Sequence, residues 1–97
     1  MMIGEHVRVL RESQKLLLRE LAAELEIDTA MLSKMERGVR PFRKEDLVKL
    51  SKILKEDQKE LYKMWLADKI LRTTDNDEFT KEALKIALRN CNSDDNN

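Results

Sequence analysis

The chain has 97 residues, enough for one domain, and its 41% hydrophobic content with only two Gly and one Pro favours an all-α bundle over a sheet. Its formal net charge of +0 argues against a non-specific polyanion binder, although residues 29–44 hold five basic side chains and one acid. The single cysteine disfavours a disulfide within the chain and a thiolate metal site. No apolar run approaches the ~18 residues of a membrane span, and no signal-peptide pattern is present, which disfavours membrane insertion and secretion. We therefore expect a soluble, cytoplasmic protein without a metal or cofactor.

Four short helices are predicted in the first part of the chain, over residues 3–15, 18–26, 27–38 and 44–54. In each of them apolar residues recur three and four positions apart, which places them on one helical face. Asp28 is the expected N-cap of the third helix and Gly38 its C-terminal stop. In the turn that follows, Val39 and Phe42 are predicted to be buried. The apolar positions of the four helices are Ile3, Val7, Leu10, Leu18, Leu21, Ala22, Leu25, Leu32, Met35, Leu47, Leu50, Ile53 and Leu54.

Two further helices are predicted over residues 57–72 and 79–90, with the polar linker 73–78 between them. The first carries two apolar stripes, so it needs two packing partners. One partner is expected to be the core, and the other the C-terminal helix, a second subunit or both. The stripes comprise Leu61, Met64 and Trp65 on one side and Tyr62, Leu66 and Ile70 on the other. We therefore divide the chain into a domain of residues 1–72 and a C-terminal helical extension of residues 73–97.

Residues 18–37 have the pattern that a tight corner of two helices demands. Ala22 is small enough for the helices to approach where they cross, and Ile27 can fill the turn between them. Leu32 and Met35 can be buried while the opposite face of their helix stays free. That free face is small, polar or basic, so it can enter a major groove without steric conflict.

This arrangement resembles the helix-turn-helix of the Cro/cI-like (XRE) transcriptional regulators over residues 3 to about 61. The motifs that carry the resemblance are LA at 21–22, I at 27, LSKMERG at 32–38 and LVKLSKIL at 47–54. It implies a five-helix domain whose recognition helix spans residues 29–37, followed here by an additional helix for packing or dimerisation. The sequence departs from the family in three places: Leu18 replaces a Gln that usually binds a phosphate, Glu26 replaces a Gly, and KLLL at 15–18 replaces the commoner Gly-Leu-Ser-Gln, which predicts a weak N-cap for the second helix. A left-handed residue at the turn of Glu26 costs a non-Gly side chain ~1 kcal/mol.

Two groups of DNA-contacting residues follow from this reading. Base contacts are expected from Thr29, Ala30, Ser33, Lys34 and Arg37. Phosphate contacts are expected from Arg19, Arg40, Arg43 and Lys44. The alternative for each residue is an ordinary solvated surface position, since exposed basic and small side chains are common on helices.

Four other residues have structural interpretations. Glu36 can form an ion pair that fixes the loop, and the lone His6 has no second metal ligand near it in sequence. Cys91 is expected to pack or to be an exposed thiol, and Trp65 to pack or to anchor a dimer. No Ser-His-Asp set, Gly-rich phosphate loop or paired-histidine motif is present, so we do not expect an enzyme.

A homodimer is expected because one recognition helix reads too few base pairs to discriminate against a genome. The expected interface residues are Trp65, Leu66, Ile70, Phe79 and Ile86. The predicted function is a sequence-specific transcriptional regulator that binds double-stranded DNA at an inverted-repeat operator, as an autoregulating repressor or a restriction–modification controller. The alternative is a protein-interaction module or antitoxin that uses the same fold with little DNA binding. Neither a membrane nor a small-molecule ligand is indicated.

Overall fold

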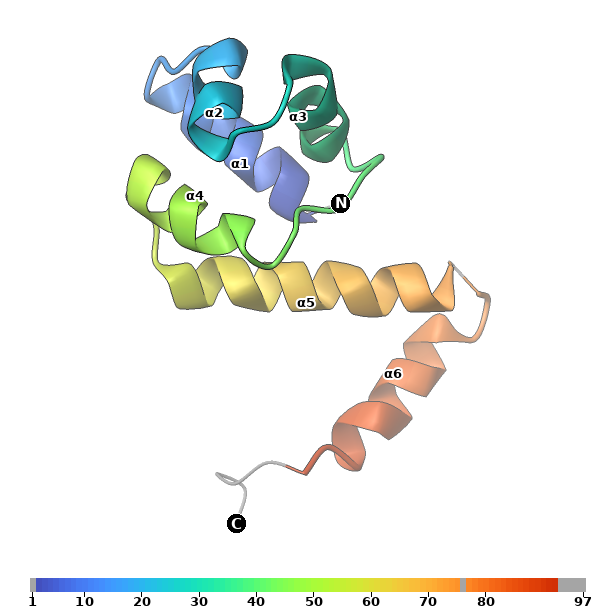
Figure 1. Ribbon diagram of the computed structural model, residues 1–97. Coiled ribbons are helices and arrows are strands. Elements are labelled where there is room, and N and C mark those ends of the chain that lie inside the picture. The colour runs from blue at the N-terminus through green and yellow to red at the C-terminus, as the bar shows by residue number, and fades with distance from the viewer. Residues whose placement is uncertain (1, 76, 93–97) are drawn as a thin grey trace.

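The computed structural model describes residues 2–75 and 77–92, and all regular structure in this part is helical. In chain order the helices are α1 (Met2–Ser13), α2 (Leu18–Leu25), α3 (Thr29–Glu36), α4 (Asp46–Leu54), α5 (Gln58–Thr74) and α6 (Thr80–Arg89) (Figure 1). The predicted all-α class is confirmed. Within the described residues, no helix combines the length and the apolar character needed to cross a bilayer. Residues 93–97 of the predicted extension lie outside the described part.

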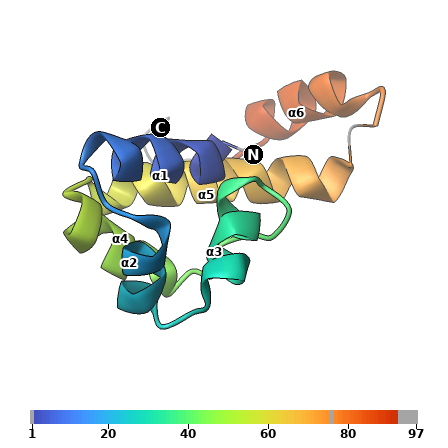
Figure 2. The same cartoon turned by 90° about the horizontal axis from the view of Figure 1, so that it is seen from above.

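The first five helices enclose one apolar core. α1 packs against α3, α4 and α5, α2 packs against α3 and α4, and α4 packs against α5 (Figure 2). α1 and α4 therefore connect the α2–α3 corner to α5. Almost every apolar position predicted for the first four helices contributes to this core. Its buried side chains are Ile3, Val7, Leu21, Ala22, Leu25, Leu32, Met35, Phe42, Leu47, Leu50, Leu54 and Leu61.

The ends of α2 and α3 are set by local chemistry that the sequence predicted. Asp28 caps α3, because its Oδ1 accepts a hydrogen bond from the backbone N–H of Met31 at 2.7 Å. Gly38 follows α3 with φ of 79°, as expected of a C-terminal stop. Glu26 ends α2 in the left-handed conformation, with φ of 60°, so the expected non-Gly strain is present at the turn. The start of α2 has no side-chain N-cap, and only Glu20 reaches back, accepting from the N–H of Leu17 at 2.8 Å.

Two expectations for the loop and for α5 were wrong. Val39 is 64% exposed, whereas Phe42 is buried as predicted. The N–H of Val39 donates to the carbonyl oxygen of Lys34 at 2.9 Å, which closes the end of α3 and leaves the Val39 side chain outside the core. α5 continues to Thr74, two residues into the predicted linker, and the hydroxyls of Thr73 and Thr74 donate to the carbonyl oxygens of Lys69 and Leu71 in the preceding turn.

The start of α1 is fixed by two features that the sequence did not suggest. Asp68 of α5 is 2% exposed, and its carboxylate accepts from the backbone N–H groups of Met2 at 3.0 Å and Ile3 at 2.9 Å. A carboxylate at a helix N-terminus satisfies free N–H groups and complements the helix dipole. Gly4 lies against the backbone carbonyls of Met35 and Glu36, where a side chain would overlap the end of α3.

α6 stands apart from this core. None of its residues is buried, and in Figure 1 it runs away from the end of α5 instead of folding back on the bundle. Phe79, Ile86 and Leu88 are 64%, 54% and 76% exposed. The apolar face predicted for this helix therefore exists and is largely open to solvent in the described part of the chain.

Candidate nucleic-acid interface

The outer face of α3 presents the residues predicted to contact bases. Thr29, Ala30, Lys34 and Arg37 are exposed, and Ser33 is half-buried. On the opposite face of the same helix, Leu32 and Met35 are buried in the core. Arg37 Nε lies 3.4 Å from Ser33 Oγ, a long contact that leaves the guanidinium free to reach another acceptor. The structure thus brings all five residues onto one accessible surface.

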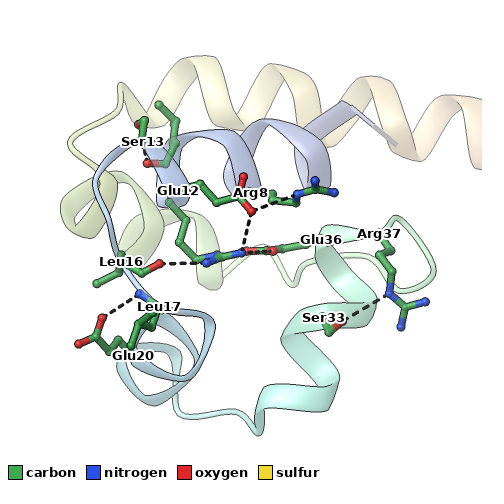
Figure 3. A network of polar contacts seen from close by, with 11 residues as sticks. Arg8, Glu12, Ser13, Leu16, Leu17, Glu20, Ser33, Glu36 and Arg37 are labelled. Atoms are coloured by element: carbon green, nitrogen blue, oxygen red, sulfur yellow. Dashed lines mark hydrogen bonds and ion pairs between the residues drawn. The ribbon is translucent and has the colours of Figure 1, made fainter.

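The acidic residue of α3 points the other way, into a buried ion pair. Glu36 is 6% exposed and accepts two hydrogen bonds from Arg11 of α1, at 2.7 Å from Nε and 3.0 Å from Nη2. Arg11 Nη1 also donates to the carbonyl oxygen of Leu16 at 2.9 Å, so one guanidinium joins α1, the α1–α2 turn and α3. In Figure 3 Glu36 faces this network, whereas Arg37 points away from it and a dashed line joins Arg37 to Ser33.

This ion pair raises the pKa of Arg11 above its usual value, chiefly through the hydrogen bond to Glu36. The sequence suggested an intramolecular ion pair for Glu36 but gave no partner. Arg11 was missed, although it follows Ile3 and Val7 at the spacing of the buried stripe of α1. A charged residue on an apolar stripe was the signal that could have found it, because a buried charge requires a partner.

The predicted phosphate-contacting residues differ in how free their charges are. Arg19 at the start of α2 and Arg40 in the α3–α4 loop are exposed. Lys44 is exposed as well. Arg43 instead binds the fully buried Asp46, through Nε at 3.1 Å and Nη2 at 2.8 Å.

The hydrogen bond to Asp46 raises the pKa of Arg43, and Glu45 lies a further 3.6 Å from its Nη1. Two carboxylates therefore offset the charge of Arg43, which makes it the least favourable phosphate ligand of the four predicted. Asp46 also accepts from the N–H of Arg43 at 2.9 Å and so fixes the turn that leads into α4. Sequence reasoning missed Asp46, which reads as an ordinary first-turn acid.

The residues predicted for a dimer interface fall into two groups. Leu66 and Ile70 of α5 are 36% and 48% exposed, and Phe79 and Ile86 are more exposed still. Trp65 is half-buried against the core, where its Nε1 donates to the carbonyl oxygen of Phe42 at 2.7 Å. Leu66 and Ile70 of the second stripe and the exposed apolar residues of α6 are thus open, whereas Tyr62 and Trp65 are engaged within their own chain.

Metal chemistry finds no support in the part of the chain that the structure describes, which holds no group of three His, Cys, Asp or Glu side chains suited to an ion. His6 Nε2 lies 2.8 Å from Glu56 Oε2, so this histidine links α1 to the α4–α5 turn. Cys91 is exposed and free.

Comparison with known proteins identifies the domain. No curated protein and no solved structure gave a match. The helix-turn-helix family matches residues 7–57, more than half of the chain, from the middle of α1 to the turn before α5. This domain implies DNA binding and transcriptional regulation, and its members are not enzymes. The chain belongs to the helix-turn-helix family of the Cro/cI-like (XRE) type.

Proposed function

We propose that this protein is a sequence-specific regulator that inserts α3 into the major groove of DNA. The observation that carries the proposal is the charge distribution on α3. Its one acid, Glu36, is buried against Arg11, so the outward surface from Thr29 to Arg37 is neutral or basic throughout. A helix surface without carboxylates can approach the phosphate-lined groove without electrostatic cost.

Within this proposal, the residues of α3 and its surroundings have separate roles. Thr29, Ala30, Ser33, Lys34 and Arg37 are proposed to read base edges. Arg19, Arg40 and Lys44 are proposed to bind phosphates, which position the helix without reading sequence. Arg43 contributes less to phosphate binding, since Asp46 already holds two of its N–H groups.

A homodimer on an inverted repeat is proposed because two open apolar surfaces remain on each chain. Leu66 and Ile70 form one of them and Phe79 and Ile86 of α6 the other, all more exposed than a monomer requires. Pairing of these surfaces would present two copies of α3 to half-sites about one helical turn, ~34 Å, apart. The regulator would then act as an autoregulating repressor or a restriction–modification controller. These roles are proposed because the chain resembles small regulators of these kinds.

Selection of bound sequences from a random pool of DNA duplexes tests this proposal. Recovery of a palindromic consensus would support the homodimer and the operator together, and a consensus found upstream of the protein's own gene would support autoregulation. Failure to enrich any sequence would contradict sequence-specific binding.

A matched pair of variants tests the role of α3. Lys34→Ala with Arg37→Ala should abolish binding to the selected duplex, whereas Lys81→Ala with Lys85→Ala on α6 should not. Both double variants remove two exposed charges, so a difference between them reports position and not net charge. Equal affinity of the first variant and the unmodified protein would refute the assignment of α3. If the protein were a protein-interaction module instead, its affinity for DNA would show no steep decrease with rising salt.

A further inference from the structure

A row of basic and aromatic side chains extends from the α3–α4 loop onto α5. Lys44 Nζ lies 5.4 Å from the ring centroid of Tyr62, and Lys69 Nζ lies 5.4 Å from that of Trp65. The two rings stack, with centroids 5.8 Å apart and an interplanar angle of 18°. We call Lys44, Tyr62, Trp65 and Lys69 the α5 strip. Three of its four members lie outside residues 7–57, the part that matches the helix-turn-helix family.

The α5 strip is held in a fixed position relative to the loop. Trp65 donates its Nε1–H to the carbonyl oxygen of Phe42 at 2.7 Å, and Phe42 itself is buried in the core. Tyr62 and Trp65 are both half-buried against that core. The two rings are therefore held in place by the core, and both ammonium groups lie over them. A ligand would not have to order these aromatic side chains on binding.

Both lysines keep their charge available. Lys44 and Lys69 are exposed, and neither is within ion-pair distance of a carboxylate in residues 2–75 or 77–92. An aromatic ring attracts an ammonium group through its quadrupole but does not neutralise it. Arg43 shows the contrast, because Asp46 neutralises it at the base of the same loop.

We infer that the α5 strip binds the sugar–phosphate backbone of the duplex that α3 reads, with Lys69 as a phosphate contact beyond the helix-turn-helix. This inference rests on the proposed function. The occupant is DNA because the strip begins at Lys44, in the same basic loop as Arg40, and continues that positive surface along α5. Phosphate oxygens are the anionic groups that such a row of ammonium groups would meet next to an occupied major groove.

Salt dependence of DNA binding tests the inference directly. The full chain is titrated against a fluorescein-labelled duplex of the sequence selected for binding, and the anisotropy is followed over a series of KCl concentrations. Each phosphate contact contributes about 0.9 to the slope of log affinity against log salt. Lys69→Ala should therefore reduce the magnitude of that slope by about 0.9, whereas Lys69→Arg, which keeps the charge, should leave it unchanged.

Lys63→Ala is the matched control on the same helix. Lys63 lies about 120° around α5 from Lys69, because six residues separate them. It pairs with Glu60 at 3.0 Å, and its replacement removes the same formal charge as Lys69→Ala. The slope should stay at its original value in this variant.

Each outcome decides between the alternatives. An unchanged slope in Lys69→Ala overturns the inference, and so does an equal decrease in Lys63→Ala, which would report net charge alone. If Lys69→Ala leaves the slope unchanged but weakens self-association in sedimentation velocity, the strip binds a second copy of the chain instead of DNA. If Lys34→Ala weakens binding to the duplex but Lys69→Ala leaves the salt slope unchanged, only this inference fails. If selection recovers no duplex that the wild-type protein binds, the proposed function fails as well.

Discussion

Removal of the charge on Glu36 should be among the most destabilising conservative changes in this protein. Glu36→Gln keeps the shape of the side chain but leaves the guanidinium of Arg11 buried beside a neutral amide. Loss of one partner of a buried ion pair costs about 3–5 kcal/mol. We expect a value near 3 kcal/mol, because Arg11 retains its bond to the Leu16 carbonyl oxygen and its side chain is 11% exposed. Urea denaturation followed by circular dichroism measures this free energy.

Two companion variants separate the ion pair from general effects of mutation. Arg11→Met with Glu36→Leu removes both charges, so it should recover most of the stability that Glu36→Gln loses. Arg8→Ala breaks only the exposed Arg8–Glu12 pair, whose atoms are 3.5 Å apart, and should change stability by less than about 0.5 kcal/mol. A loss below about 1 kcal/mol in Glu36→Gln would refute the reasoning, since it would show that Arg11 does not need Glu36 while Glu12 remains 3.8 Å from its Nη2.

The pH dependence of this contribution has a definite sign on the arginine side. The pKa of Arg11 is raised in the folded state, so the stabilisation that comes from its protonated form is fully present below the usual arginine pKa. That stabilisation is lost only as the pH rises through the raised pKa. Deprotonation of Arg11 should therefore make no contribution to unfolding at neutral or mildly alkaline pH. Over that range, the free energy of unfolding should change with pH in the same way in the wild-type protein and in Arg11→Met.

Three other changes test how the scaffold is built. Gly4→Ala should destabilise the fold by about 1–3 kcal/mol in urea denaturation, because the new Cβ overlaps the carbonyl oxygen of Met35; unchanged stability would mean that α1 can shift freely. Glu26→Gly should stabilise it by about 1 kcal/mol, since φ there is 60°, and a loss would show that the turn is not strained. Asp68→Asn should lower the free energy of unfolding by about 1–2 kcal/mol, because it weakens the hydrogen bonds to the N–H groups at the start of α1. Hydrogen exchange through local opening of α4 should stay unchanged.

The parts of the fold that the sequence predicted are governed by interactions between neighbours in the chain. The periodic apolar residues of α1 to α4 define which face is buried, and the cap by Asp28 needs only an N–H three residues later. The left-handed turn at Glu26 was expected from the family resemblance, which places a Gly at that position. Local spacing also placed Lys34 on the free face of α3, which the structure leaves exposed.

The parts that the sequence did not predict depend on residues far apart in the chain. Arg11 and Glu36 are 25 residues apart, and Asp68 reaches the first turn of α1 across more than 60 residues. Each partner alone resembles an ordinary surface charge in a chain with 39% charged residues. Only the packing of α1 against α3 and α5 shows that these charges are buried and paired. Arg43 is a different case, because its partner Asp46 is only three residues away and the pair is local.

The two apolar stripes of α5 predicted that the helix needs two packing partners but did not identify the second partner. The pattern demanded two partners, and the core satisfies one of them through Leu61, Trp65 and the flank of Tyr62. Leu66 and Ile70 remain open, and α6, which could have covered them, buries none of its own residues. Exposed apolar surfaces on neighbouring helices favour association, since their burial is worth about 25 cal/mol for each Å² removed from water. Because the two surfaces lie on the same chain, a second copy would supply both of the missing partners at once, which is why the proposed homodimer is the simplest arrangement that completes α5 and α6 together.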